Sequence, residues 1–401
     1  MGELPADVAL ADHRGRHHAD QQEHHRPTGV GVAAQMNLEL TDEQVALRDT
    51  TRRFLAEKAP IAHHVRRLLD DPTGIEPAVW RGLADLGCTG LLVPEQHGGA
   101  GMTMVEAGIV AEELGAALYP GPWLSTAVAA PRALIRLCAG GDTAAGLLRG
   151  IADGTTHVAV CFLDTPPMAA TREGETTVLH GQARAVPDAA AADVLLAPAE
   201  DAGDTALFAV NTGSAGVAVR PEHHIDPTHK QSRVTFDAAP ARRLATASAD
   251  DVAAVVDDVL IAACADALGA ARAVMDLAVE YAKTRTQFGQ PIGSFQAVQH
   301  LCVDMYETVE LARSGVIHAL WVSDAPDGDE RHLAALRAKA FAGRLAGVAD
   351  TAIQVFGGIG YTWEHDAHLY LKRLLGYSAF LGGPDRYLTE VGARLAKRGS
   401  P

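Results

Sequence analysis

The chain lacks two features that mark large classes of proteins. Although 48% of its residues are hydrophobic, they form no long apolar run, so the sequence predicts no membrane span. It also lacks an excess of basic residues, because 34 Lys and Arg stand against 50 Asp and Glu, for a net charge of −16. This balance argues against a nucleic-acid-binding surface, and an anionic ligand would need locally clustered positive charge.

Cysteine is scarce and shows no functional spacing. The five cysteines have no CxxC pattern, and most of them lie in apolar helical contexts. They are Cys88, Cys138, Cys161, Cys264 and Cys302. This usage fits a reducing compartment without structural disulfides, so we expect a cytoplasmic protein.

The first 35 residues differ from the rest of the 401-residue chain. Residues 1–35 are rich in His, Gln, Ala and Gly, have no apolar period and lack the apolar core of a signal peptide, which predicts a disordered tail. Its His pairs are expected to be solvated rather than to hold a metal. Because the globular pattern begins just after Met36, we hypothesise that translation starts there.

The remaining sequence divides into three predicted domains. Residues 36–152 carry a helical pattern whose Pro and Gly breaks indicate loops between helices. Residues 153–246 carry short apolar runs between Gly, Pro and Asp turns, which is typical of a small β-barrel. Residues 247–398 return to the three-and-four spacing of amphipathic helices, which predicts a C-terminal four-helix bundle. The expected fold class is therefore α+β and mainly helical.

The turn between the first two helices of the predicted bundle has unusual chemistry. Gly289 and Pro291 end the first of these helices, and the apolar period resumes after them. The turn and its flanks carry Arg285, Gln287, Phe288, Gln296 and His300. A plain connector would have small polar residues instead, whereas an Arg fork beside an aromatic ring suits a phosphate attached to a flat heterocycle. A simple helical hairpin remains the alternative explanation.

Longer motifs include this turn. The run Tyr281-Ala-Lys-Thr-Arg-Thr-Gln-Phe-Gly-Gln-Pro-Ile is followed by Phe295-Gln-Ala-Val-Gln-His and later by Gln354-Val-Phe-Gly-Gly-Ile-Gly-Tyr. In this order the motifs resemble the acyl-CoA dehydrogenase family of flavoproteins, and the similarity extends from about Leu38 to about Leu395. The resemblance implies FAD-dependent oxidation of an acyl-CoA thioester to the enoyl-CoA, with electrons passed to electron-transfer flavoprotein or a similar acceptor.

The resemblance also assigns residues to FAD, which in this family is shared between subunits. Arg285 would pair with the pyrophosphate, and Phe288 would line the adenine side of a flavin held by a neighbouring subunit. The full set of implied cofactor contacts is Arg285, Phe288, Gln296, Gln354, Gly357 and Gly358. Taken without the resemblance, the Gly357-Gly-Ile-Gly run is more typical of a helix C-cap than of a ligand loop.

The catalytic carboxylate of the family is missing. Its usual glutamate position falls on Leu381, and the alternative position on the helix before the Arg285 turn falls on Val259. The nearby acids are Asp258 and Glu364. Asp258 is one residue away from the alternative position, and one residue turns a side chain by about 100° on a helix. Asp258 would therefore point elsewhere, and a solvated charge beside Asp257 is the alternative to a catalytic role for it. Glu364 fits a cap or salt bridge at the start of the last helix.

The β domain departs from the family as well. The family has a Thr-Glu-Pro-x-Ala-Gly-Ser-Asp-like loop that holds the isoalloxazine, and this chain has Cys161-Phe-Leu-Asp-Thr-Pro-Pro-Met-Ala-Ala there. Ala185-Val-Pro-Asp replaces the frequent Trp-Ile-Thr. The half-site for the chain's own flavin is therefore predicted to be eroded, whereas the half that reaches a neighbour's flavin is intact.

These departures predict the non-catalytic subunit of a heteromeric acyl-CoA dehydrogenase, completing the FAD site of a sister subunit in an α2β2 heterotetramer. The segment Gly360-Tyr-Thr-Trp-Glu-His-Asp-Ala-His-Leu-Tyr resembles the small subunits of such enzymes, including those that act on dicarboxylyl-CoA and steroid side-chain CoA esters. Two alternatives stay open. One is a self-sufficient homo-oligomeric dehydrogenase with an unusual base, and the other is a binding or scaffold protein that kept the fold and lost the chemistry.

Overall fold

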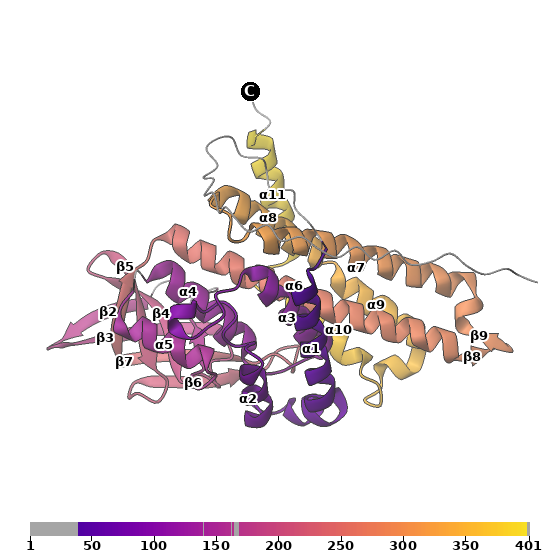
Figure 1. The fold of residues 1–401 in the computed structure, drawn as a ribbon, viewed down its shortest axis with the longest axis horizontal. Helices are drawn as coiled ribbons and strands as arrows, with labels where there is room; N and C mark the ends of the chain where they lie inside the picture. Colours follow the sequence, from indigo (N-terminus) through magenta and orange to yellow (C-terminus); the bar gives the residue numbers. More distant parts are fainter. Residues whose placement is uncertain (1–38, 139, 162, 164–167, 399–401) are drawn as a thin grey trace, which may run out of the picture. The chain divides into compact units, whose positions relative to one another are not determined.

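The computed structural model describes residues 39–138, 140–161, 163 and 168–398, all within one unit, Leu38–Pro401 (Figure 1). The predicted tail at residues 1–35 and the hypothetical start at Met36 lie outside the described residues, as does most of the loop after Cys161. The predicted division at residues 152/153 and 246/247 stays a prediction. Among the described residues, no helix combines the length and the apolar character needed to cross a membrane.

The part of the chain before the β domain is helical, as the sequence predicted. Its α-helices are α1 (Asp42–Lys58), α2 (Pro77–Asp85), α3 (Met104–Ala116), α4 (Ala130–Leu137) and α5 (Asp142–Ala152). Short 3-10 or π segments separate them: Ile61–Val65, Arg66–Leu68, Glu95–His97 and Leu124–Ala129. Helix α1 begins with a capping box, in which the Gln44 backbone N–H donates to Thr41 Oγ1 and the Thr41 N–H donates to Gln44 Oε1.

The middle of the chain forms a closed sheet, which confirms the predicted barrel. Its strands are β1 (Val158–Val160), β2 (Met168–Glu173), β3 (Thr176–Pro187), β4 (Val194–Asp201), β5 (Asp204–Asn211), β6 (Val217–Glu222) and β7 (Gln231–Thr246). The strand order is β1-β4-β2-β3-β7-β5, and pairing of β4 with β5 closes the ring. Alternate side chains such as Leu179, Leu195, Phe208 and Val234 fill its core.

The C-terminal third consists of long helices. They are α6 (Ala249–Thr284), α7 (Gln296–Val322), α8 (Gly328–Ala342), α9 (Leu345–Phe356), α10 (Ala367–Ala379) and α11 (Pro384–Arg398), with a 3-10 segment at Gly357–Tyr361. The chain breaks at Gly343, between α8 and α9. A Cβ at Gly343 would lie 2.6 Å from Pro384 Cβ, so the start of α11 packs directly against the break.

The connection between α6 and α7 is a β-hairpin rather than a plain turn. Strands β8 (Thr286–Gln287) and β9 (Gln290–Pro291) pair antiparallel at the C-terminal end of α6 (Figure 1). Phe288 (φ 53°) and Gly289 (φ 80°) occupy the tip, the two-residue pattern of positive φ that tight hairpins require. The hairpin therefore holds Phe288 in a backbone conformation that bulky residues rarely adopt.

Candidate functional site

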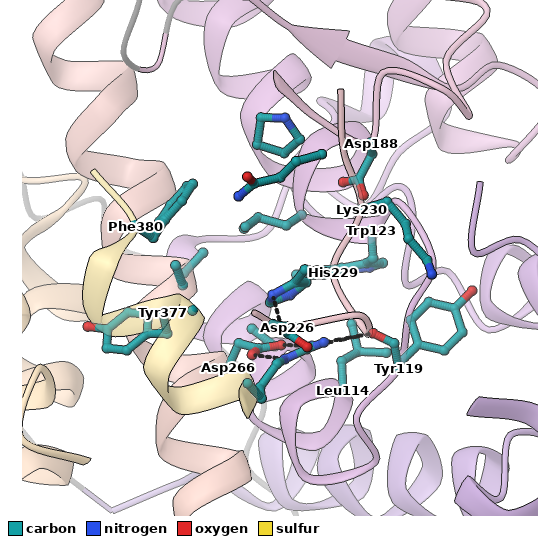
Figure 2. A pocket seen from close by; sticks show the side chains of 18 of the residues that line it. Leu114, Tyr119, Trp123, Asp188, Asp226, His229, Lys230, Asp266, Tyr377 and Phe380 are labelled. Carbon is teal, nitrogen blue, oxygen red and sulfur yellow. Dashed lines mark hydrogen bonds and ion pairs between the residues drawn. The ribbon is translucent and has the colours of Figure 1, made fainter. Parts of the chain in front are cut away.

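Two adjoining cavities lie where the β domain meets the helices. The inner cavity is bounded by α3, α6 and α10, the 119–124 loop and the connection between β6 and β7, and its open space is about 60 Å³ (Figure 2). The outer cavity, of about 200 Å³, is lined by residues of β1, β3 and the end of α10. Both share Pro187, His224, Gln231, Gly376 and Phe380. The inner space has room for only a few water molecules, since one water needs roughly 10–15 Å³ by this measure.

A buried ion pair fills one side of the inner cavity. Arg373 on α10 is 1% exposed, and its Nε and Nη2 donate to Asp266 on α6 at 2.9 and 2.7 Å. Its Nη1 donates to Thr228 Oγ1 at 2.8 Å, and it also donates to the Tyr119 carbonyl. This fork ties α10, α6 and the β6–β7 connection together.

A second carboxylate lies beside this guanidinium. Asp226 is fully buried, accepts hydrogen bonds from the Thr228 N–H and hydroxyl, and lies 3.1 Å from His229 Nδ1. Burial opposes ionisation, but His229 and Arg373 outweigh it and hold the pKa of Asp226 well below its usual range. Asp226 and Asp266 are therefore both engaged by cationic partners.

Asp188 differs from the other two acids of the inner cavity. It is 6% exposed and accepts a hydrogen bond of 2.5 Å from Ser125 Oγ, and no ion pair joins it to a cation among the described residues. Burial raises the pKa of Asp188 to about 6. Its carboxyl thus changes charge close to neutral pH, the range in which a general base operates.

The two expected base positions carry apolar side chains in the structure. Leu381 lines the outer cavity, where its backbone adopts φ 58° and its carbonyl accepts a 2.6 Å bond from the Tyr387 hydroxyl. Val259 is fully buried in the cluster that includes Val158 and Val194, and it lines neither cavity. An apolar wall therefore stands at the position where the family's glutamate was expected.

The two nominated acids lie away from both cavities. Asp258 is 2% exposed and accepts bonds of 2.7 Å from Arg132 Nε and Arg136 Nε, so the expectation that it is a solvated charge was wrong. Glu364 is exposed in the loop before α10, and it makes no hydrogen bond or ion pair with the described residues.

The start of α10 is capped by a different residue from the one the sequence suggested. Nδ1 of His365 accepts the Ala367 backbone N–H at 3.1 Å, whereas the side chain of Asp366, which precedes the helix, makes no capping bond. Asp366 is instead paired with Arg66. An imidazole therefore satisfies the helix start, and the predicted Glu364 cap or salt bridge is not formed.

The implied FAD contacts form an exposed surface at the other end of α6. All six residues are exposed. They are Arg285, Phe288, Gln296, Gln354, Gly357 and Gly358. A ring contact of 5.2 Å between Tyr281 and Phe356 brings the Gly357 turn next to the hairpin. From Asp266, which lines the inner cavity, to Arg285 is about 29 Å along the helix at 1.5 Å per residue. A ligand enclosed in the cavities of the same chain therefore lies far from this surface.

Comparison with known proteins places the chain in a family. The model described as "Acyl-CoA dehydrogenase, N-terminal domain" matches residues 41–154, and "Acyl-CoA dehydrogenase, C-terminal domain" matches residues 260–396. The chain is 36% identical over 369 residues to acyl-CoA dehydrogenase FadE34 of Mycobacterium tuberculosis, covering 88% of this chain and 48% of that protein. It is 33% identical over 358 residues to acyl-CoA dehydrogenase IpdE2 of Mycolicibacterium smegmatis, covering 89% of this chain and 100% of that protein.

Solved structures show the same relationship. The chain matches the ChsE4-ChsE5 complex from Mycobacterium tuberculosis with a TM-score of 0.82 and 27% identity, over 91% of this chain and 100% of the matched chain. It matches a variant of the Tcur3481-Tcur3483 steroid ACAD with a TM-score of 0.81 and 28% identity, over 90% and 99%. The chain therefore belongs to the acyl-CoA dehydrogenase family. It spans about half the length of FadE34 and the whole of IpdE2.

Sequence reasoning missed the acids and the arginine of the inner cavity. Arg373, Asp266 and Asp226 are isolated along the chain, and only the fold brings them together. A signal existed for two of them, because Asp266 and Arg373 interrupt the buried stripes of their helices and charged residues are seldom fully buried unless paired. Asp188 gave no comparable signal, since it follows Pro187 at the end of a strand, where acidic turn residues are common.

Proposed function

We propose that this chain is the non-catalytic subunit of a heteromeric, FAD-dependent acyl-CoA dehydrogenase. The observation that carries the proposal is the contrast between its two regions. The Arg285 surface is complete and exposed, whereas the outer cavity has Leu381 in place of a base. The chain thus supplies part of a cofactor site to a sister subunit and leaves proton removal to that subunit's glutamate.

The chemistry of the cavities supports this division of roles. Oxidation of an acyl-CoA requires a positioned carboxylate to remove the α-proton. Asp226 and Asp266 are held by His229 and Arg373, so neither is free to act as a base. The inner cavity is also too small for an acyl chain.

The exposed surface fits a flavin dinucleotide presented by another chain. Arg285 offers a guanidinium fork for a pyrophosphate, and the backbone at Gly357 and Gly358 has open space where side chains would stand. Phe288 is 91% exposed and can cover a flat ring. FAD, when bound, supplies the acceptor for the substrate's β-hydride, and these residues would hold and orient it.

The relatives support the expected partners. The solved ChsE4-ChsE5 and Tcur3481-Tcur3483 proteins carry paired names, and the second is called a steroid ACAD. More than half of FadE34 lies outside the match, which leaves room for a second unit of similar size. We infer an α2β2 assembly with a sister dehydrogenase subunit in the cytoplasm, a bulky acyl-CoA of the steroid side-chain class as substrate, and electron-transfer flavoprotein or a similar acceptor.

One observation favours a second candidate function. Asp188 is the acid of the inner cavity that has no ion-pair partner among the described residues, and its pKa of about 6 would suit a base. A self-sufficient homo-oligomeric dehydrogenase would use it. Against this, Asp188 lines the inner cavity and not the outer one, in which Leu381 lies.

The test compares acids in the assembled enzyme by the rate of enoyl-CoA formation. Asp188→Asn and Glu364→Gln in this chain should leave the rate within about twofold of wild type, while removal of the partner's glutamate should lower it by ~10²–10⁴. Asp258→Asn should weaken folding, because it removes the carboxylate charge that pairs with Arg136 and with Arg132, which then keeps only Asp324. It should spare the rate of whatever complex assembles. A loss of two or more orders of magnitude from Asp188→Asn, with flavin retained, would favour the self-sufficient enzyme.

A further inference from the structure

A histidine links three helices near the C-terminus. His332 on α8 lies between two carboxylates from other helices, with Nδ1 2.9 Å from Asp257 Oδ2 on α6 and Nε2 3.2 Å from Glu390 Oε1 on α11. Because both ring nitrogens face carboxylates, the geometry suits the protonated ring, which donates from both. A neutral ring could donate to only one of them and would turn a lone pair toward the other.

Few apolar contacts hold α11 in place otherwise. The buried cluster beneath it consists of Leu260, Leu336, Ala340 and Tyr387, with Leu381 and Val391 packed at its edge. Leu388 and Leu395, also on α11, are 44% and 46% exposed. Figure 1 shows α11 lying beside α8. The charged bridge at His332 therefore adds to a small apolar cluster in holding the helix on α6 and α8.

The same helix holds the turn that walls the outer cavity. The Tyr387 hydroxyl donates to the Leu381 carbonyl at 2.6 Å, and Arg386 Nη1 donates to the same oxygen at 3.4 Å. Leu381 needs such support, because its φ of 58° is unfavourable for a residue with a branched side chain. Release of α11 would remove both bonds and free Leu381 from the cavity wall.

The remaining charges around His332 set the sign of its response to pH. Arg394 on α11 bonds Glu390 and lies 3.7 Å from Asp329 on α8, and Tyr387 completes the titratable groups on that side. Hydrogen bonding to Asp257 outweighs burial and raises the pKa of His332 above its ordinary 6.5. A group with a raised pKa stabilises the folded state fully below pH 6.5 and loses that contribution as pH rises through the raised value.

We propose that α11 is a pH-sensitive strap, held on α6 and α8 by protonated His332 and released, together with the Leu381 turn, when that proton is lost. With His332 protonated, the strap keeps Leu381 at one side of the outer cavity. As pH rises through the raised pKa of His332 the strap loosens, and access to the cavity rises with it. The device acts within this chain and does not depend on the identity of the bound cofactor or partner.

Hydrogen exchange of the α11 amides in the full-length protein tests the strap. After correction for the intrinsic pH dependence of exchange, protection of residues 387–395 should fall about tenfold between about pH 6 and pH 9, while α6 stays protected. His332→Gln should show low protection at both pH values, and His332→Lys, which keeps a charge, should flatten the dependence. The control His223→Gln alters an exposed histidine and should behave as wild type. Equal protection of α11 at both pH values in the wild type, or unchanged protection in His332→Gln, would overturn the proposal.

Discussion

Replacing Arg373 by Met tests whether the inner cavity is a structural cross-link. The substitution keeps most of the side-chain length and removes the guanidinium that bonds Asp266, Thr228 and the Tyr119 carbonyl. It leaves the fully buried Asp226 and the mostly buried Asp266 without that charge. Removing one partner of a buried ion pair typically costs ~3–5 kcal/mol, so we expect a loss of about 4 kcal/mol in the free energy of unfolding.

Urea denaturation followed by tryptophan fluorescence measures this loss. The matched control is Arg243→Met, which breaks an ion pair with Asp201 whose side chains are 43% and 34% exposed, and it should cost less than about 1 kcal/mol. Adding Asp266→Leu to Arg373→Met should recover part of the loss, since both charges of the pair are then absent. A cost for Arg373→Met no larger than that of the Arg243→Met control would refute the cross-link.

Three further predictions concern the cofactor surface, the cavity acid and the helix crossing. Arg285→Ala should weaken FAD retention in the assembled enzyme by about 10- to 100-fold, the worth of a charge-assisted hydrogen bond, without unfolding the chain, and Arg285→Lys should recover only part; unchanged flavin content would refute the assignment. Asp188→Asn should raise the free energy of unfolding by up to about 3 kcal/mol at pH 7–8, because burial raises the pKa of Asp188 to about 6 and so penalises its charged form there. The gain should vanish below pH 3.8, the ordinary pKa of an aspartate. Equal stability of variant and wild type at pH 8 would contradict the effect of burial on Asp188. Gly269→Ala, on α6, should lower the free energy of unfolding by more than about 2 kcal/mol, because its Cβ would lie 1.8 Å from the carbonyl oxygen of Glu112 on α3. Gly146→Ala, on the open face of α5, should be neutral or stabilising. Similar melting temperatures for the two variants would contradict the close packing of α3 on α6 at Gly269.

Local rules recovered most of the architecture. The capping box at Thr41, the long α6 and α7 helices and the barrel strands with strongly apolar runs, such as β4 and β5, all follow from pattern and period. Strands such as β2 and β6 are hard to predict from the sequence, because most of their residues are exposed or only partly buried and half-exposed strands carry little apolar signal. The break at Gly343 depends on contact with Pro384, which no local pattern reveals.

The candidate site was only partly predictable. The motif order predicted a cofactor surface at Arg285 and an apolar residue, Leu381, at the expected base position, and these residues lie in separate regions of the structure. The burial of Asp258 between two arginines of α4 was not predictable from its neighbours on α6, because those partners lie more than 120 residues earlier in the chain. Charge pairing over such separations is decided by tertiary packing.

The flavin content of this chain, purified alone and together with its sister subunit, distinguishes a partial FAD site from a complete one. We expect the chain alone to be colourless, because the surface at Arg285 supplies only part of a site, and the complex to be yellow with FAD bound between the subunits. Visible absorbance of the released flavin, set against protein concentration, gives the stoichiometry. One FAD per chain in the absence of any partner would contradict the role of this chain as a subunit that only completes a partner's FAD site.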